Sequence, residues 1–182
     1  MRAFAVVVAA LALGVSSAGA SPFVVRATAT VQRLGDFNIT RDPTLRGVTR
    51  VYGAADSCAM RTWFALAAWR TAGFRLRLAT LGSLSPGKTF CTDPKIFIDS
   101  AVVTGGRWHT AKGLYVGDSF AKFRRLYPQA RRFRNGWGIT QVYRRCVIGI
   151  CSAPYEWMPR LTAAFADGHV ASFVFPVGAQ GE

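Results

Sequence analysis

The chain has 182 residues, 51% of them hydrophobic, and it carries a formal net charge of +14 at pH 7. This length and apolar content indicate a single domain with a real hydrophobic core. The surplus of cations indicates an anionic partner or serves solubility alone. Because no nucleic-acid-binding motif accompanies the charge, we do not expect specific recognition of nucleic acid.

Residues 1–20 have the pattern of a secretory signal peptide. Arg2 precedes an uncharged apolar run from Phe4 to Val15, and the small residues Ala18-Gly19-Ala20 suit a cleavage site. A transmembrane helix would need about 20 apolar residues, and neither this run nor any later segment is long enough. We therefore expect residues 21–182 to form a single exported domain without a transmembrane segment, either secreted or associated with the cell wall.

The chain has four cysteines, and all of them follow the predicted signal peptide. In an exported protein an even number of cysteines predicts disulfides, although four cysteines allow three pairings. The spacing of Cys146 and Cys151 suits a tight hairpin closed by a cross-strand bridge, which leaves Cys58 and Cys91 as the second pair. The alternative, a four-cysteine metal site, needs pairs two to four residues apart. We expect neither a metal nor a cofactor.

A short helix is predicted between Asp42 and Gly53. Asp42 suits the N-cap, Pro43 suits the first helical position, and Gly53 follows the last periodic residue. The residues that follow are rich in β-formers, and strands are expected in four segments. These segments are Cys58–Trp69, Phe74–Ala79, Lys95–Asp99 and Ala101–Thr104.

The segment Phe74–Ala79 alternates apolar and charged residues. Such alternation predicts a strand with one buried face and one wet face. The wet face presents Arg75 and Arg77, and this pair is the first group of candidate binding residues. Arginine is also one of the residue types that dominate protein interfaces, although a solvated face is the simpler interpretation.

The segment Gly82–Thr89 matches the phosphate-binding loop pattern of nucleotide-binding proteins. That motif requires a helix directly after the loop, with its N-terminus facing the phosphate. Here Pro94 follows Thr89 too closely for such a helix. We therefore interpret the segment as an ordinary turn rich in glycine, serine and proline.

A second short helix is predicted to begin at Asp118 or Ser119 and to end near Tyr127, because Pro128 cannot continue it. Arginines crowd its end and its exit, and four of them form the second group of candidate binding residues: Arg124, Arg125, Arg131 and Arg132. Farther along, Asp167-Gly168 predicts a hairpin turn between two strands. The strands are Leu161–Ala166 and His169–Phe175.

The chain contains two histidines, His109 and His169. They do not have the helical spacing of metal ligands, and no glycine-flanked serine suggests a hydrolase nucleophile. A grouping of Ser119, His169 and Asp118 is conceivable, but their spacing does not support it. A small extracellular enzyme with an unrecognised active site near His109 or His169 is thus the alternative function.

The two predicted helices share one apolar face at a constant offset of 75 residues. Leu45, Val48 and Tyr52 align with Phe120, Phe123 and Tyr127. Each helix is followed by a strand-rich segment with one predicted disulfide. An internal repeat of this kind predicts the architecture. We therefore expect an α+β fold of two tandem repeats, about 33–104 and 108–176, that share one antiparallel sheet with the helices on one face.

This layout of short helices, antiparallel strands and one disulfide per unit resembles the fold of the β-lactamase inhibitory protein. The single repeat of that fold is similar to the small lipoprotein of the outer-membrane assembly machinery. More narrowly, the segment Trp108–Ser119 is similar to a segment of uncharacterised secreted proteins from high-GC actinobacteria. The resemblance implies an antiparallel sheet whose open concave face receives a partner, but it places no inhibitory loop residues in this chain.

The function predicted from the sequence is binding rather than catalysis. We expect a secreted, disulfide-stabilised interaction protein that uses a sheet face bearing arginines and aromatic residues. Its partner would be a protein or an anionic polymer of the cell envelope, because the chain itself is strongly basic.

Overall fold

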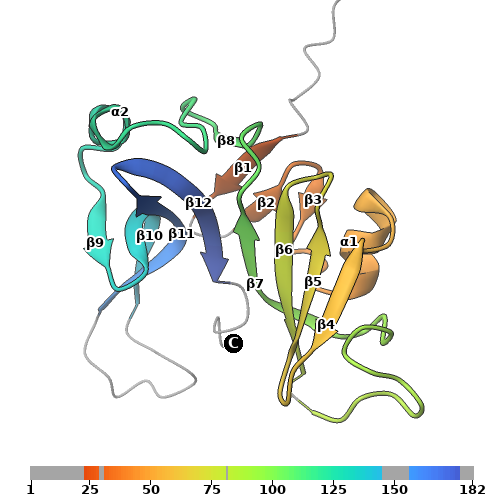
Figure 1. Cartoon of the computed structure of the whole chain (residues 1–182). Coiled ribbons are helices and arrows are strands. Elements are labelled where there is room, and N and C mark those ends of the chain that lie inside the picture. Colours follow the sequence, from red (N-terminus) through yellow and green to blue (C-terminus); the bar gives the residue numbers. More distant parts are fainter. Residues whose placement is uncertain (1–22, 29–30, 81, 145–155, 177–182) are drawn as a thin grey trace, which may run out of the picture.

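The computed structural model describes residues 23–28, 31–80, 82–144 and 156–176 (Figure 1). The predicted signal peptide, Cys146 and Cys151 lie outside these described residues. Within them, no helix is long and apolar enough to cross a membrane.

The predicted α+β class is wrong, because the protein is mostly β. Strands contain 46% of the described residues and helices contain 11%. The two helices are α1 (Leu45–Tyr52) and α2 (Phe120–Leu126), and they lie at opposite ends of the molecule (Figure 1). Since each helix has only about two turns, the pair cannot form a layer over one face of a sheet. A second sheet takes that place.

The larger sheet is antiparallel and contains eight strands in the order β4-β5-β6-β7-β12-β11-β10-β9. The first four strands in this order follow α1 in the chain. They are β4 (Ser57–Met60), β5 (Ala65–Trp69), β6 (Phe74–Ala79) and β7 (Phe97–Val103). The other four follow α2. They are β9 (Arg131–Phe133), β10 (Gly136–Arg144), β11 (Glu156–Ala166) and β12 (His169–Pro176). The two groups join where β7 pairs with β12, from Val103 opposite Phe173 to Ser100 opposite Pro176.

The smaller sheet has the strand order β3-β2-β1-β8. Its strands are β1 (Val24–Ala27), β2 (Gln32–Leu34), β3 (Phe37–Asn38) and β8 (His109–Thr110). All its pairs are antiparallel except β1 with β8. The buried side chain of Gln32 fastens this sheet to the larger one, because its Nε2 donates to the carbonyl oxygens of Arg160 (2.8 Å) and Pro176 (3.0 Å).

Both helices begin at a hydroxyl N-cap. Thr44 Oγ1 accepts a hydrogen bond from the amide of Gly47, and Ser119 Oγ accepts one from the amide of Lys122. The prediction that Asp42 caps the first helix is wrong. Asp42 instead accepts a hydrogen bond from Thr44 Oγ1 (2.6 Å) and so orients the residue that is the cap.

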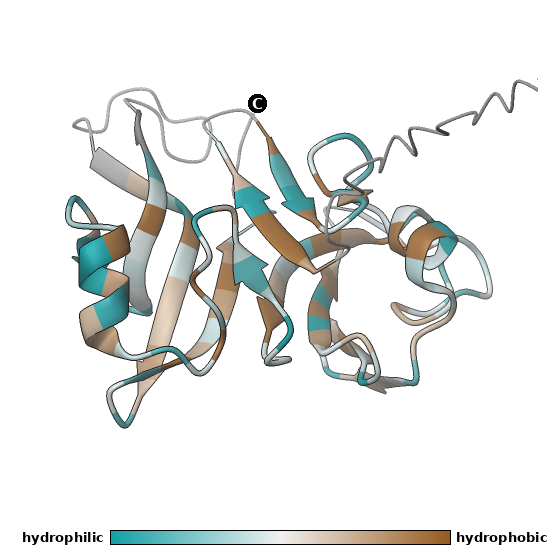
Figure 2. Ribbon diagram, turned by 90° about the horizontal axis from the view of Figure 1, so that it is seen from above, coloured by the Kyte–Doolittle hydropathy of each residue, from teal (hydrophilic) through white to brown (hydrophobic). Residues whose placement is uncertain are grey.

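The core lies between the two sheets. Along β6, Phe74, Leu76 and Leu78 are buried while the arginines between them are exposed, as the alternation along the strands in Figure 2 indicates. Residues of the smaller sheet such as Leu34 and both helices contribute to the same cluster. The larger sheet thus has its apolar face covered, and the opposite face of β5, β6 and β7 is left open.

A disulfide joins Cys58 in β4 to Cys91 in the segment between β6 and β7. It confirms the predicted pairing of these two cysteines. Cys58 lies opposite Ala67, a buried residue of β5, and so the bridge leaves β4 from the core side of the sheet. It holds the long connection from Ala79 to Phe97 against the edge strand.

Candidate functional site

The open face of the first four strands carries the strongest candidate site. It consists of the residues of β5, β6 and β7 that alternate with core residues, together with Phe64 beside them. Its pairs are Leu66 opposite Arg77 and Ala68 opposite Arg75. Its apolar residues Phe64, Leu66, Ala68 and Val102 are half-buried, and Phe97 and both arginines are exposed. We call this surface the open face below.

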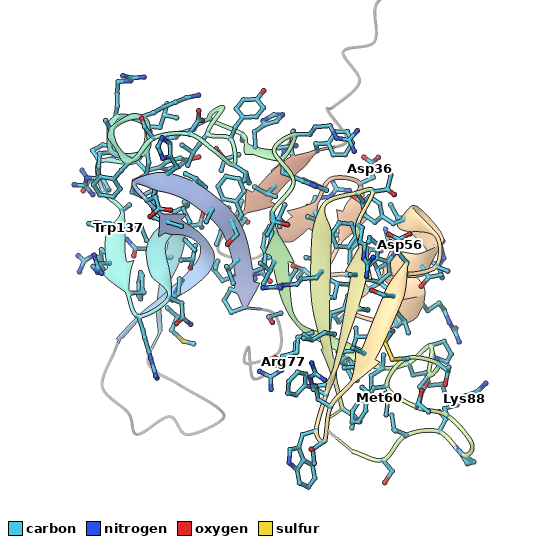
Figure 3. All side chains as sticks on the ribbon, viewed as in Figure 1. Asp36, Asp56, Met60, Arg77, Lys88 and Trp137 are labelled. Carbon is cyan, nitrogen blue, oxygen red and sulfur yellow. A yellow bond between two sulfur atoms is a disulfide. The ribbon has the colours of Figure 1, made fainter. Side chains whose placement is uncertain are left out.

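Arg77 is held in place on the open face by two different contacts. Its Nε lies 3.2 Å from the carboxylate of Asp99 on β7. Its guanidinium also lies 4.4 Å from the centre of the Phe64 ring, within the range of a cation–π interaction. In Figure 3, Arg77 lies toward the end of these strands near which Met60 is also labelled. These two contacts orient the guanidinium group of Arg77, although its side chain stays partly exposed.

A change of register brings Asp99 to Arg77. Arg77 lies opposite Ser100, but the next residue, Leu78, lies opposite Ile98, so that Asp99 is the extra residue of a bulge. A bulge redirects the side chain of the extra residue. Here it gives Arg77 a carboxylate partner on the neighbouring strand. Asp99 cannot be recognised as a partner of Arg77 from the sequence, because the contact depends on strand register.

Arg75 lies in a different environment one pair farther along the strand. Its neighbours across the strands are Ala68 and Val102, which carry no charge. Arg75 is exposed, and it makes no ion pair among the residues that the structure describes. Arg75 is thus a cation without an acidic partner among the described residues, and Arg77 is a cation that is already oriented. Both lie beside apolar side chains on the same strand.

The second arginine group lies elsewhere. It surrounds α2 and β9, and β9 is the edge strand opposite β4 in the larger sheet. Arg124 stacks over Trp137 at 5.0 Å and donates to the carbonyl oxygen of Ala130 (3.3 Å). Arg131 and Arg132 belong to β9, and Arg125 is exposed on α2. The six predicted binding residues therefore form two separate groups.

The open face of the first four strands has no counterpart in the middle of β11. In β11, four consecutive residues are buried, although neighbouring residues of a strand face opposite sides. These residues are Arg160, Leu161, Thr162 and Ala163. Both faces of β11 are covered at this point. A partner can therefore reach the outer face of β5, β6 and β7 but not the corresponding part of β11.

His109 makes contacts that fit a structural role. It lies in β8, where its Nδ1 is 3.0 Å from the carbonyl oxygen of Thr110. Its ring packs against Tyr115 at 4.6 Å. A hollow of about 290 Å³ lies among Phe23, Tyr52 and other residues, but His109 does not line it. These contacts do not give His109 a nucleophile or a carboxylate partner among the described residues.

Ser119 and His169 are neighbours in the fold, since an isolated bridge pairs their backbones. Their side chains are engaged separately. Ser119 Oγ caps α2, and Asp118 contacts the ammonium group of Lys122 at 2.7 Å. The Nδ1 of His169 is 2.9 Å from the carbonyl oxygen of Asp167. The three residues are thus close in space, but their hydrogen bonds are not those of a catalytic triad.

The segment that matches a phosphate-binding loop contains turns. The described residues from Gly82 to Lys95 form no helix. Asp93 organises this segment, because its carboxylate accepts hydrogen bonds from the amides of Ser85 (2.8 Å) and Lys95 (2.9 Å). These two bonds lower the pKa of Asp93. Within the described part of the chain, no cluster of three histidine, cysteine or acidic side chains could hold a metal ion.

Comparisons of the chain with protein-family models, with curated proteins and with solved structures find no match. The resemblance to the β-lactamase inhibitory protein fold therefore stays a prediction from the sequence. Among the described residues, the open face combines charge and apolar surface in a defined geometry.

Proposed function

We propose that this chain is an exported, disulfide-stabilised binding protein whose open face engages an anionic partner, either an acidic protein surface or an anionic polymer of the cell envelope. One observation carries this proposal. Arg77 is fixed between Asp99 and the Phe64 ring, beside the uncompensated Arg75.

This arrangement suits binding because the arginine side chain is ordered before a partner arrives. A free arginine loses rotamer entropy when it is immobilised in a complex. Contacts with Asp99 and Phe64 reduce that loss at Arg77. The guanidinium keeps further N–H donors for a carboxylate or phosphate. Leu66 and Val102 supply apolar area next to the charges.

Export is part of the proposal, and the disulfide supports it. Disulfides persist in secreted and envelope proteins and are rare in reducing cytosol. The Cys58–Cys91 bridge stabilises the edge strand beside the open face. An exported basic protein meets anionic polymers and other secreted proteins, which are the two partner classes named here.

The proposal is tested by capture of partners on immobilised protein from cell-wall polymer and secreted-protein fractions. The test variant is Arg75→Glu/Arg77→Glu. The matched control is Arg131→Glu/Arg132→Glu, which makes the same change of charge on the opposite edge strand. We expect the test variant to bind at least about tenfold more weakly, and the control to keep most of its binding.

Two results would contradict the proposal. One is that neither fraction yields a ligand, while Arg75→Glu/Arg77→Glu behaves like the wild type. The other is that both double variants lose binding equally, since the effect would then reflect net charge alone. The single variant Arg75→Glu is included because a glutamate at position 77 would face Asp99 and could lower stability. Thermal unfolding of each variant separates the two effects.

A further inference from the structure

The hairpin that joins β4 and β5 ends in an exposed tryptophan. Its tip is the turn Arg61-Thr62-Trp63-Phe64, closed by a hydrogen bond from the Arg61 amide to the Phe64 carbonyl oxygen (2.8 Å). Trp63 is 80% exposed, and Met60 beside it is 48% exposed. Tryptophan is usually well buried in soluble proteins. Its exposure at a hairpin tip therefore indicates a contact surface.

Apolar side chains surround this tip on both sides of the sheet. Met60 lies opposite the buried Ala65 and so belongs to the core side. Phe97, which is 43% exposed, lies opposite Ala79 on the other side. Phe64 is on that side as well, where the guanidinium of Arg77 lies over its ring. The apolar surface thus wraps around the end of the sheet and does not form one flat patch. We call it the hairpin tip.

Cations lie around the hairpin tip. Arg61 is part of the turn and is exposed. Met60, Arg77 and Lys88 are at the same end of the molecule in Figure 3. The Cys58–Cys91 disulfide holds the segment that contains Lys88 against β4. Asp93, an acidic residue of that segment, is buried and accepts hydrogen bonds from backbone amides. Asp99 pairs with Arg77 and offsets its charge. Arg61 and Lys88, which are both exposed, leave the charge near the tip mainly positive.

We propose that the hairpin tip is a membrane-surface contact that binds anionic lipid bilayers, with Trp63 entering the interface and the surrounding cations meeting lipid headgroups. Tryptophan favours the boundary between headgroups and acyl chains. Basic residues near an anionic surface add attraction of their own. The hairpin tip shares Phe64, Phe97 and Arg77 with the open face. It does not include Arg75, and it involves a different class of ligand.

The shape of the hairpin tip favours a bilayer over a protein pocket. A protein partner buries its hot-spot residues in one well-packed pocket, which suits side chains that share a face. Met60 and Phe97 lie on opposite sides of the sheet with Trp63 beyond both. A fluid interface accommodates all three side chains at once. The net charge of +14 selects anionic over neutral lipid.

The test is sedimentation of the purified exported product with vesicles of phosphatidylcholine alone and with phosphatidylglycerol added. Mass spectrometry defines the amino terminus of the product, since a retained apolar segment 4–15 would itself bind lipid. We expect binding to the anionic vesicles that weakens as salt is raised. Trp63→Ser should bind roughly tenfold or more weakly, and Arg61→Gln about fivefold more weakly.

The matched control is Tyr115→Ser. It removes another exposed aromatic residue, between β8 and α2 at the other end of the molecule (Figure 1). This variant should bind like the wild type. Tryptophan emission should shift to shorter wavelength with anionic vesicles, and the shift should be much smaller in Trp63→Ser, because Trp69 and Trp108 are buried and Trp137 packs against Phe120 and Phe123.

Three results would overturn the proposal. They are binding that Trp63→Ser leaves unchanged, equal binding to neutral vesicles, and no binding to either vesicle type. Concentration-dependent self-association that Trp63→Ser abolishes, without any lipid binding, would assign the tip to a second copy instead. Arg75→Glu serves as a further reference, since it tests the open face and should leave vesicle binding within about twofold of the wild type.

Discussion

The two parts of the larger sheet each follow a short helix, and the two helices are anchored in the same way. Thr44 caps α1 and Ser119 caps α2. These caps are 75 residues apart, which is the offset of the helix faces. One turn on, each helix buries a side chain completely, Val48 in α1 and Phe123 in α2. Residues at equivalent positions therefore have the same roles, as helix cap and as buried side chain. The tandem repeat itself stays a prediction.

The difference between the two parts lies in what covers their strands. The first part, β4 to β7, has one face in the core and one face open. In the second part, β11 is buried on both faces around Leu161, and α2 packs on an aromatic cluster that includes Trp137 and Phe165. Because β11 is covered on both faces at this point, it offers no sheet face there to a partner. The candidate sites are in the less covered part for this reason.

The largest effect is expected from truncating the buried residue of each helix. Phe123→Ala should lower the free energy of unfolding by about 3–5 kcal/mol, because its ring contacts four other aromatic rings. Val48→Ala removes less apolar volume and should cost about 2 kcal/mol. Urea unfolding monitored by circular dichroism measures both changes.

The control for these variants is Val51→Ala in α1. Val51 is partly exposed, so its truncation should change the free energy of unfolding by less than about 0.5 kcal/mol. Equal losses for Phe123→Ala and Val48→Ala would show that the aromatic cluster is not what distinguishes the second part of the molecule.

An intermediate effect is expected at the two tyrosines that end the helices. The hydroxyl of Tyr52 donates to the carbonyl oxygen of Leu34 (2.8 Å), and that of Tyr127 donates to Thr110 Oγ1 (2.6 Å). Both hydrogen bonds fasten a helix to the smaller sheet. Each Tyr→Phe substitution should cost about 1 kcal/mol, and the two losses should add because the sites are far apart.

The same tyrosines predict a loss of stability in alkali. Burial raises the pKa of Tyr52, with a further contribution from Asp36, and burial also raises the pKa of Tyr127. A raised pKa in the folded state means that their stabilisation is complete below the ordinary value of about 10 and is lost above it. The double variant Tyr52→Phe/Tyr127→Phe should lose less stability than the wild type between pH 9 and pH 11. A steeper loss would contradict this assignment.

Much of the local structure could be predicted from the sequence. The alternation of apolar and charged residues in Phe74–Ala79 correctly predicts which residues of β6 are buried and which are exposed. The Asp167-Gly168 turn joins β11 to β12, with a positive φ at both residues. The smaller sheet was missed, because strands of two to four residues carry too little periodicity to detect. That omission led to the wrong fold class.

The candidate sites were predicted less completely. Arg75 and Arg77 lie on an open face as expected, but the contact of Arg77 with Asp99 depends on a bulge that no local pattern specifies. The two arginine groups could not be separated without the strand order. No sequence pattern indicated that Trp63 is exposed, because its exposure depends on where the β4–β5 hairpin turns.

The smallest effect is expected from the ion pairs between an aspartate that precedes each helix and a cation within that helix, where the two parts differ again. Lys122 lies 2.7 Å from Asp118 with both side chains mostly buried, whereas Arg50 lies 4.0 Å from Asp42 and is largely exposed. Lys122→Gln should therefore cost about 0.5–1 kcal/mol at neutral pH, and Arg50→Gln close to nothing. Comparing the same change in both helices removes the general effect of losing one cation.

Lowering the pH provides a further test of the difference between the two ion pairs. Burial acts to raise the pKa of Asp118, but the ammonium group of Lys122 and the amide of Tyr115 outweigh it, so the pKa is lowered overall. A carboxyl with a lowered pKa stabilises the fold above its ordinary value of about 3.9, and this stabilisation is lost as pH falls below it. The difference between wild type and Lys122→Gln, measured by urea unfolding, should thus shrink from pH 6 to pH 3. If Arg50→Gln showed the same acid dependence, the closer ion pair of α2 would have no separate role.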